Sequence, residues 1–191
     1  MDKDIQSKIQ EQKNNFTLHN IVRFREMIRY LPDKKLQLFR NIPFLIHINS
    51  QDFPGYVKAT ADINFGVWHF ESSGFAKDIA KNNKDAAKLL KNKVKKPLVE
   101  AIYHIGSLGT FTQSEKSDFD FWVIIDKSKH DSSLFKLLEE KLNLIISHSR
   151  EEFDQEVSFF LHDSNDLTNN YFPEDEEQGD ILTVPKLLIK E

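Results

Sequence analysis

Two aspartates and a Gly-Ser pair lie close together in the segment 104–123, near the middle of the chain. Asp118 and Asp120 are two residues apart, and because side chains on a strand alternate between faces, both carboxylates project from one side. Paired carboxylates suit Mg²⁺, whose coordination is commonly completed by water and phosphate oxygens. Gly106 and Ser107 let the backbone approach an anion closely and offer N–H and hydroxyl donors. The segment therefore predicts a site for a metal ion and a triphosphate.

A third carboxylate is expected on a neighbouring strand, and the segment 154–161 offers two candidates, Asp154 and Glu156, on one face. Glu156 is favoured because it lies nearer to the apolar strand residues, and Asp154 stays as the alternative. Three carboxylates are sufficient to hold two Mg²⁺ ions roughly 3.5–4 Å apart, as two-metal sites do. An Asp-x-Asp pair alone is common on surface strands, so the hypothesis depends on the Gly-Ser turn and the third acid.

The first half of the chain carries mainly helical patterns. The polar start up to Asn15 is expected to be frayed. The spacing of apolar residues then predicts a helix that stops at Pro32, and a shorter helical run follows. In order, the expected elements are the helix 16–31, the helical run 36–40, a strand from Ile63 to Phe70 and a surface helix from Phe75 to Lys96 that Pro97 ends.

The second half alternates between the two periods. Strand-like runs are expected over Leu98–Ile105, Phe119–Ile125 and Val157–Leu161, with a helix over Ser132–Ser147 and the start of another over Ile181–Ile189. The predicted fold class is α+β, with a small mixed or antiparallel sheet flanked by helices and an N-terminal helical segment. The expected division is a frayed opening (1–15), a helical segment with one strand (16–96) and a catalytic core (97–191).

Composition excludes several classes of site and partner. The chain has no Cys, which rules out disulfides, thiolate metal sites and cysteine nucleophiles, and its seven His show no pair at metal-ligand spacing. A formal net charge of -4 argues against long nucleic acids as the main partner. The charged start lacks the apolar stretch of a secretory signal, and no segment approaches the length of a membrane span. A cytoplasmic protein is expected.

These motifs resemble those of the class I, enterobacterial-type adenylate cyclases, a branch of the DNA polymerase beta-type nucleotidyltransferase superfamily. The residues that carry the resemblance are Gly106-Ser107, Gln113-Ser114, Ser117-Asp118-x-Asp120-x-Trp122-Val123 and Glu156-Val-x-Phe-Phe-Leu161. Weaker similarity at Leu31-Pro32, Pro54-Gly55-Tyr56 and Asp180-Ile-Leu182 extends the match over residues 16–191. The chain departs from the family at Leu108, Thr110 and Phe111, where members tend to have more Ser.

The resemblance implies a lyase that cyclises ATP to cyclic AMP and pyrophosphate with Mg²⁺ or Mn²⁺. Asp118 and Asp120 would hold the metal, and Glu156 would complete the site and assist deprotonation of the ribose hydroxyl. Phosphate contacts would come from Gly106, Ser107, Gln113, Ser114 and Ser117. Family members are much longer, so the chain is expected to be a fragment, with a regulatory domain possible after it. Two alternatives stay open: nucleotidyl transfer to another acceptor, and a nucleotide-binding or regulatory module without turnover.

Overall fold

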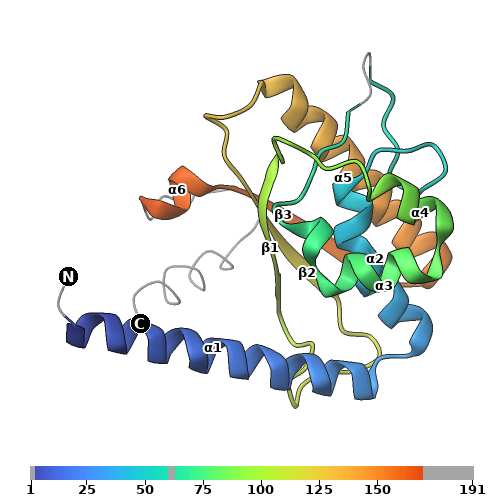
Figure 1. Cartoon of the computed structure of the whole chain (residues 1–191). Coiled ribbons are helices and arrows are strands. Elements are labelled where there is room, and N and C mark those ends of the chain that lie inside the picture. The colour runs from blue at the N-terminus through green and yellow to red at the C-terminus, as the bar shows by residue number, and fades with distance from the viewer. Residues whose placement is uncertain (1–2, 60–62, 170–191) are drawn as a thin grey trace, which may run out of the picture.

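The computed structural model describes residues 3–59 and 63–169 of the 191-residue chain (Figure 1). Within these ranges the N-terminal half is mainly helical, and the three strands follow it. The predicted helix over Ile181–Ile189 lies outside the described residues. None of the helices in the described ranges combines the length and the apolar character that a membrane crossing requires.

Two helices open the chain. Helix α1 (Lys3–Tyr30) ends just before Pro32, as its sequence predicts, but it begins at Lys3, so residues 3–15 are helical rather than frayed. Straight-chain polar residues with good helix propensity occupy this stretch, and an i,i+4 ion pair joins Lys8 to Asp4 at 3.1 Å. Helix α2 (Asp33–His47) continues through Pro43 and is longer than the predicted run 36–40.

The sheet has three strands in the order β1 (Val99–Ile105), β2 (Phe119–Ile125) and β3 (Val157–Asp163). Strand β1 is antiparallel to β2, and β2 is parallel to β3. The parallel pair requires a crossover, which helix α5 (Ser132–Phe153) supplies. The mixed sheet with flanking helices confirms the α+β prediction at this level, whereas membership of the nucleotidyltransferase fold stays a prediction.

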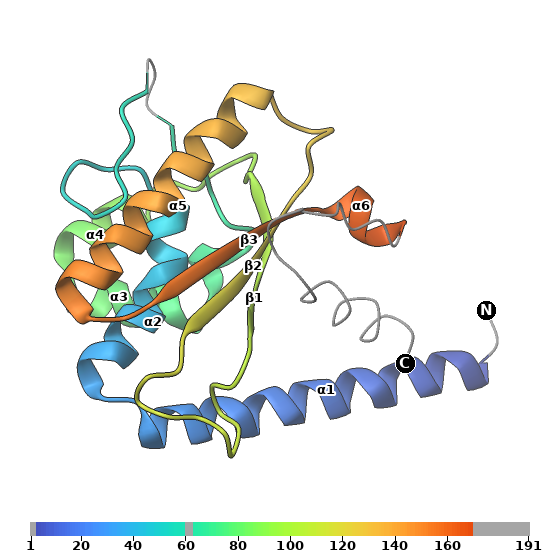
Figure 2. The same ribbon diagram turned by 180° about the vertical axis from the view of Figure 1, so that it is seen from behind.

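The core lies between one face of the sheet and the helices α2 and α5. Alternate residues of β2 point into it and are buried, from Phe119 to Ile125. The ring of Phe39 on α2 lies 5.4 Å from that of Phe119 and 5.5 Å from that of Phe121, measured between centroids. Figures 1 and 2 show α2, α3, α4 and α5 on this side of the sheet, with α1 crossing one end of it. The helices thus pack against one face of the sheet and fix its position.

The predicted strand from Ile63 to Phe70 is wrong. Val67 forms a single parallel bridge with Val99, and Phe70 begins a 3-10 helix (Phe70–Ser72). The side chains of Phe65, Val67 and Phe70 are all buried, which is what produced the strand-like pattern. The segment is an irregular connection that packs on the core and contacts β1 through this one bridge.

The predicted helix from Phe75 to Lys96 is two short helices, α3 (Gly74–Asn82) and α4 (Lys84–Leu89). Asn83 separates them in an extended conformation with φ of -137°, and its side chain accepts hydrogen bonds from the backbone N–H groups of Asp85 and Ala86. Asn is a favoured N-cap because its side chain satisfies donors that a helix start leaves free. The second helix then ends at Leu89, well before Pro97.

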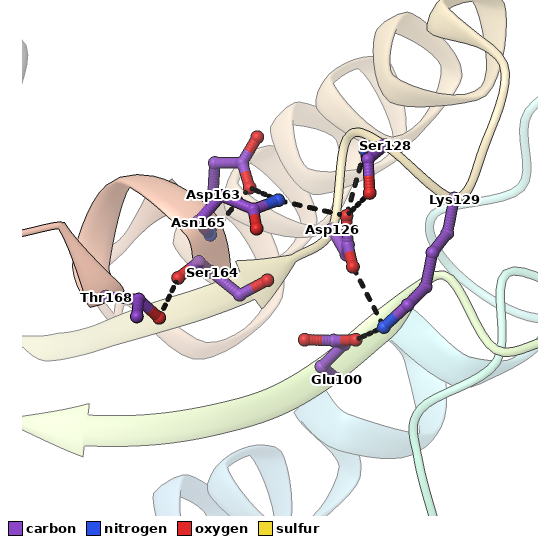
Figure 3. A network of polar contacts seen from close by, with 8 residues as sticks. All are labelled: Glu100, Asp126, Ser128, Lys129, Asp163, Ser164, Asn165 and Thr168. Atoms are coloured by element: carbon purple, nitrogen blue, oxygen red, sulfur yellow. Dashed lines mark hydrogen bonds and ion pairs between the residues drawn. The ribbon is translucent and has the colours of Figure 1, made fainter.

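A network of polar side chains lies at the end of β2 (Figure 3). Asp126, directly after β2, accepts from the hydroxyl of Ser128 at 2.5 Å and from the side-chain amide of Asn165, on helix α6 (Ser164–Thr168), at 3.2 Å. Lys129 lies 2.8 Å from Asp126 and 2.5 Å from Glu100 on β1. Lys129 first, and then Ser128, hold the pKa of Asp126 well below its usual range.

Candidate active site

The strand register brings the predicted acids to one end of the sheet. Ile105, the last residue of β1, pairs with Asp120 on β2, and Asp120 pairs with Ser158 on β3. The N–H of Phe119 donates to the carbonyl of Glu156 at 3.0 Å, directly before β3 begins. The end of β1 and the beginnings of β2 and β3 therefore meet at one place, and the role of these residues as a metal site stays a prediction.

The Gly-Ser turn lies directly against one of these carboxylates. Gly106 follows β1 with φ of +94°, a conformation that non-glycine residues rarely adopt. A Cβ atom at this position would lie 3.2 Å from Oδ2 of Asp120. The hydroxyl of Ser107 donates to that of Ser117 at 2.9 Å, which ties the turn to the residue before Asp118. Glycine is thus required here both by the backbone conformation and by the closeness of the acid.

The loop between β1 and β2 is ordered by its own polar groups. Ser114 donates its backbone N–H to the hydroxyl of Ser117 at 2.9 Å. The side-chain oxygen of Gln113 accepts from the N–H of Gly109 at 2.6 Å. The buried Nε2 of Gln113 has no hydrogen-bond partner among the residues described. Of the predicted phosphate contacts, Gln113 therefore keeps a side-chain donor that is not already engaged.

Asp120 is the predicted acid whose surroundings act most clearly on its charge. Asp120 is half-buried, and its pKa is raised, first by burial and then by the negative charge of Asp118; Glu156 adds a smaller repulsion. A hydrogen bond from Ser158 opposes this shift. Asp118 and Glu156 are exposed. In the described part of the chain, no Lys or Arg forms an ion pair with any of the three acids.

A divalent cation fits this donor set chemically, because carboxylate oxygens are the ligands that Mg²⁺ prefers and the mutual repulsion leaves negative charge to neutralise. The side chains, however, are not arranged as a finished cation site: over residues 3–59 and 63–169, no group of three His, Asp or Glu side chains is placed to hold a metal ion. Magnesium sites commonly use one or two carboxylates and take the remaining ligands from water and substrate phosphates.

Gln155 is a positioning residue that sequence reasoning did not single out. It is buried, and its Nε2 donates to the carbonyl of Ser117 at 3.0 Å and to that of Glu156 at 2.9 Å. It therefore joins the residues that precede β2 and β3. The neighbouring Asp154 ends α5 in a left-handed conformation with φ of 48°. Of the two acids weighed for the third position, Glu156 is the one whose charge acts on Asp120.

Arg23 of α1 is a second residue that the sequence did not indicate. Its Nη2 donates to the carbonyls of Gly106 and Leu108, both at 2.8 Å. A local pattern gives no signal for this contact, because the partners are 83 and 85 residues away along the chain.

A cavity of about 660 Å³ lies elsewhere, between α2, α3, α5 and the loop that contains Pro54. Apolar side chains such as Phe44, Phe53 and Phe75 share its lining with polar ones such as Arg40. None of the predicted site residues lines it. The carboxylate end of the sheet is the better candidate for chemistry, because the glycine turn and the predicted acids meet there.

Comparison with known proteins agrees with the resemblance of the motifs. Residues 8–191 match the family model described as the adenylate cyclase NT domain, which is nearly the whole chain. The chain belongs to this family. All of the predicted site residues lie within the part that matches the adenylate cyclase NT domain.

Two curated relatives carry the name adenylate cyclase. The protein from Haemophilus influenzae is 26% identical over 161 residues, covering 78% of this chain and 18% of the relative. The protein from Pasteurella multocida is 27% identical over 134 residues, covering 66% of this chain and 15% of the relative. The chain thus spans less than a fifth of the length of these relatives. No solved structure matches it.

Proposed function

We propose that this adenylate cyclase NT domain carries a class I catalytic site that converts ATP to cyclic AMP and pyrophosphate. The observation that carries the proposal is the meeting of a glycine turn with Asp120, whose carboxylate is half-buried and repelled by the nearby acids Asp118 and Glu156, at one end of the sheet. Membership of the adenylate cyclase family supports it independently.

The triphosphate would bind at the turn. Gly106 lets the backbone come close to phosphate oxygens, and the N–H of Ser107 is the nearest backbone donor. The Nε2 of Gln113, which is buried and has no partner in the described part of the chain, would be a further donor once the loop opens towards the phosphate. Ser114 and Ser117 act through the loop, since the Ser117 hydroxyl accepts from both Ser107 and the N–H of Ser114.

The carboxylates would serve the charged part of the reaction. Asp118 and Asp120 would hold Mg²⁺ or Mn²⁺ with Glu156 completing the set, and the ion would neutralise charge on the phosphates when bound. Asp120 needs the Ser158 hydrogen bond because its half-buried carboxylate otherwise faces only repulsion from the other two acids.

The bond changes are those of an in-line displacement. The ribose 3′-oxygen forms a bond to the α-phosphorus, the bond from that phosphorus to the bridging oxygen breaks, and pyrophosphate leaves. The hydroxyl proton passes to a carboxylate, for which Glu156 is the candidate because it is exposed and lies beside Asp120. Correct orientation of the two reacting groups is the larger part of the task.

Incubation of the chain with ATP and Mg²⁺ or Mn²⁺, followed by mass identification of the products, tests the proposal. Cyclic AMP with pyrophosphate supports it. Transfer of AMP to an added acceptor would instead indicate a nucleotidyltransferase with the same site, because both reactions begin with attack on the α-phosphorus.

A second candidate is a nucleotide-binding or regulatory module without turnover. One observation favours it: the acids in the described part of the chain do not form a finished cation site. Metal-dependent binding of ATP with no product, measured by calorimetry, would identify this case. In this case a domain C-terminal to this region could control turnover. Turnover by a longer chain, with none by the present one, would show that such a domain is needed.

A further inference from the structure

The side chain of Arg23, on helix α1, contacts the turn that follows β1. The Nη2 of Arg23 donates to two carbonyls, those of Gly106 and Leu108, at 2.8 Å each. Hydrogen bonds from a charged donor are stronger than neutral ones. The guanidinium therefore joins the peptide group between Gly106 and Ser107 to the one between Leu108 and Gly109.

The backbone of α1 also touches the loop directly. Gly109 has φ of +75°, and a Cβ atom there would lie 2.1 Å from the carbonyl oxygen of Arg23. No side chain fits at this distance. The contact between helix and loop is therefore close on both sides: the arginine side chain reaches the turn, and the loop glycine reaches the helix backbone.

The geometry of the peptide unit links this contact to the site. In a trans peptide the C=O and the following N–H point in opposite directions. With the carbonyl of Gly106 directed to Arg23, the N–H of Ser107 points away from α1. This N–H is the backbone donor assigned above to phosphate. Arg23 thus fixes the direction of a donor that it does not itself touch.

The docking of α1 rests on a short part of the helix. Met27 and Leu31 are buried and Phe24 is partly buried against the core. Further towards the N-terminus, Phe16 and Leu18 are 60% and 61% exposed. Arg23 lies at the boundary between the docked and the exposed part, so the turn depends on whether the last turns of α1 are in place.

We propose that Arg23 is a positioning residue that orients the Gly106–Gly109 turn for phosphate binding when α1 is docked. The proposal rests on the function proposed above for the turn. A neighbouring group is consistent with this arrangement: burial, and then the charge of Arg23, lower the pKa of His104 to about 4, so this imidazole stays neutral at neutral pH.

The test compares Arg23→Ala and Arg23→Lys with the matched control Arg25→Ala, an exposed arginine on the same helix. Loss of two charge-assisted hydrogen bonds predicts a rise of about tenfold in the KM for ATP in Arg23→Ala. Arg23→Lys should lie between it and the wild type, because one ammonium is not a planar fork. Arg25→Ala should keep wild-type kinetics. Guanidinium added to Arg23→Ala should restore part of the affinity, which a purely structural role would not produce.

A second variant addresses the same contact from the loop. Gly109→Ala should raise KM as Arg23→Ala does, whereas Gly74→Ala should not, because a Cβ atom at Gly74 has open space. Melting curves of each variant establish that it is folded. A folded Arg23→Ala with wild-type KM would overturn the proposal.

Hydrogen exchange separates this inference from the proposed function. The backbone amide hydrogens of residues 106–117 should exchange faster in Arg23→Ala than in the wild type. Their exchange rates in Arg25→Ala should equal those of the wild type. Both expectations hold whether or not the chain turns over ATP. Absence of cyclic AMP from the wild type refutes the function, while wild-type exchange in Arg23→Ala refutes the positioning role. Faster exchange with unchanged ATP affinity would also refute it, because the turn would then be loosened without consequence for phosphate.

Discussion

The two ends of strand β2 carry aspartates in opposite electrostatic situations. Asp126, after the strand, accepts from Ser128 and Asn165 and pairs with Lys129, so its pKa is lowered (Figure 3). Asp120, near the beginning, is half-buried beside Asp118 and has only Ser158 as a donor, so its pKa is raised. A carboxylate that is paired with donors of the protein itself contributes to the stability of the folded state. The charge of a carboxylate that lies among other acids is not balanced by the fold, which is why we propose a cation at the Asp120 end.

The largest effect should come from removing the negative charge of an aspartate at each end of β2. Asp120→Asn should lower turnover about a hundredfold to a thousandfold, the scale for loss of one electrostatic group in an active site, and leave the melting temperature near that of the wild type. Asp118→Asn should behave alike. Asp126→Asn should do the reverse, keeping turnover and losing stability. Initial rates measure turnover, and melting curves measure stability. Full activity in both Asp118→Asn and Asp120→Asn would contradict the assignment of these aspartates to the site.

Stabilisation of the protein by metal and nucleotide should depend on Asp120 and not on Asp126. With Mg²⁺ and 3′-deoxy-ATP, which lacks the attacking hydroxyl, the wild type at a hundred times the Kd should gain about 2.7 kcal/mol, or about 5–10 °C in Tm. The gain should be much smaller in Asp120→Asn and unchanged in Asp126→Asn. Differential scanning fluorimetry measures it, with EDTA as the control. Equal gains in the two variants would show that the cation binds elsewhere.

Substitution of the turn glycine should give a smaller effect. Gly106→Ala introduces a side chain at φ of +94° and places its Cβ 3.2 Å from Oδ2 of Asp120. The left-handed backbone costs about 1–2 kcal/mol for an L-residue, and the displaced carboxylate should lower kcat/KM about tenfold. Gly74→Ala, with open space around it, is the control. Urea denaturation and steady-state kinetics together would contradict this if the two alanine variants behaved alike.

The sequence predicted best the elements whose pattern and partners are both local. The bounds of β2 match the expected Phe119–Ile125, because alternate burial repeats along the strand itself. The stretch from Ile63 to Phe70 has similar composition, yet whether it joins a sheet depends on which segment lies beside it. Asn83 shows a signal that was overlooked, since an Asn inside a helical pattern can cap a new helix.

Prediction of the site was limited in the same way. Spacing alone placed Asp118 and Asp120 together, and the register of the sheet then brings the Gly106 turn and Glu156 to them. The groups that orient the site were missed. Gln155 acts through backbone carbonyls, which accept a hydrogen bond whatever the side chain. Arg23 reaches across 83 residues, and a single arginine in an amphipathic helix looks like any solvated one.

The smallest effect, and the most direct comparison of the two ends, is the pH dependence of stability without metal. For Asp126 the folded pKa is below the ordinary value, so its contribution is present above the unfolded pKa and is lost as pH falls through the folded pKa. For Asp120 the folded pKa is raised, so the native state is penalised above that pKa, and the penalty disappears as the pH falls below the unfolded value.

Urea denaturation in EDTA at several pH values between about 7 and about 3 should therefore give opposite trends. The free energy of unfolding of the wild type minus that of Asp126→Asn should shrink as pH falls, because the paired carboxylate becomes protonated in the unfolded chain first. The same difference against Asp120→Asn should rise. Asn removes the titration in both cases and is close in size, so packing changes cancel between pH values. If both differences moved in the same direction, the two aspartates would have like environments, and the electrostatic argument for a cation at the Asp120 end would fail.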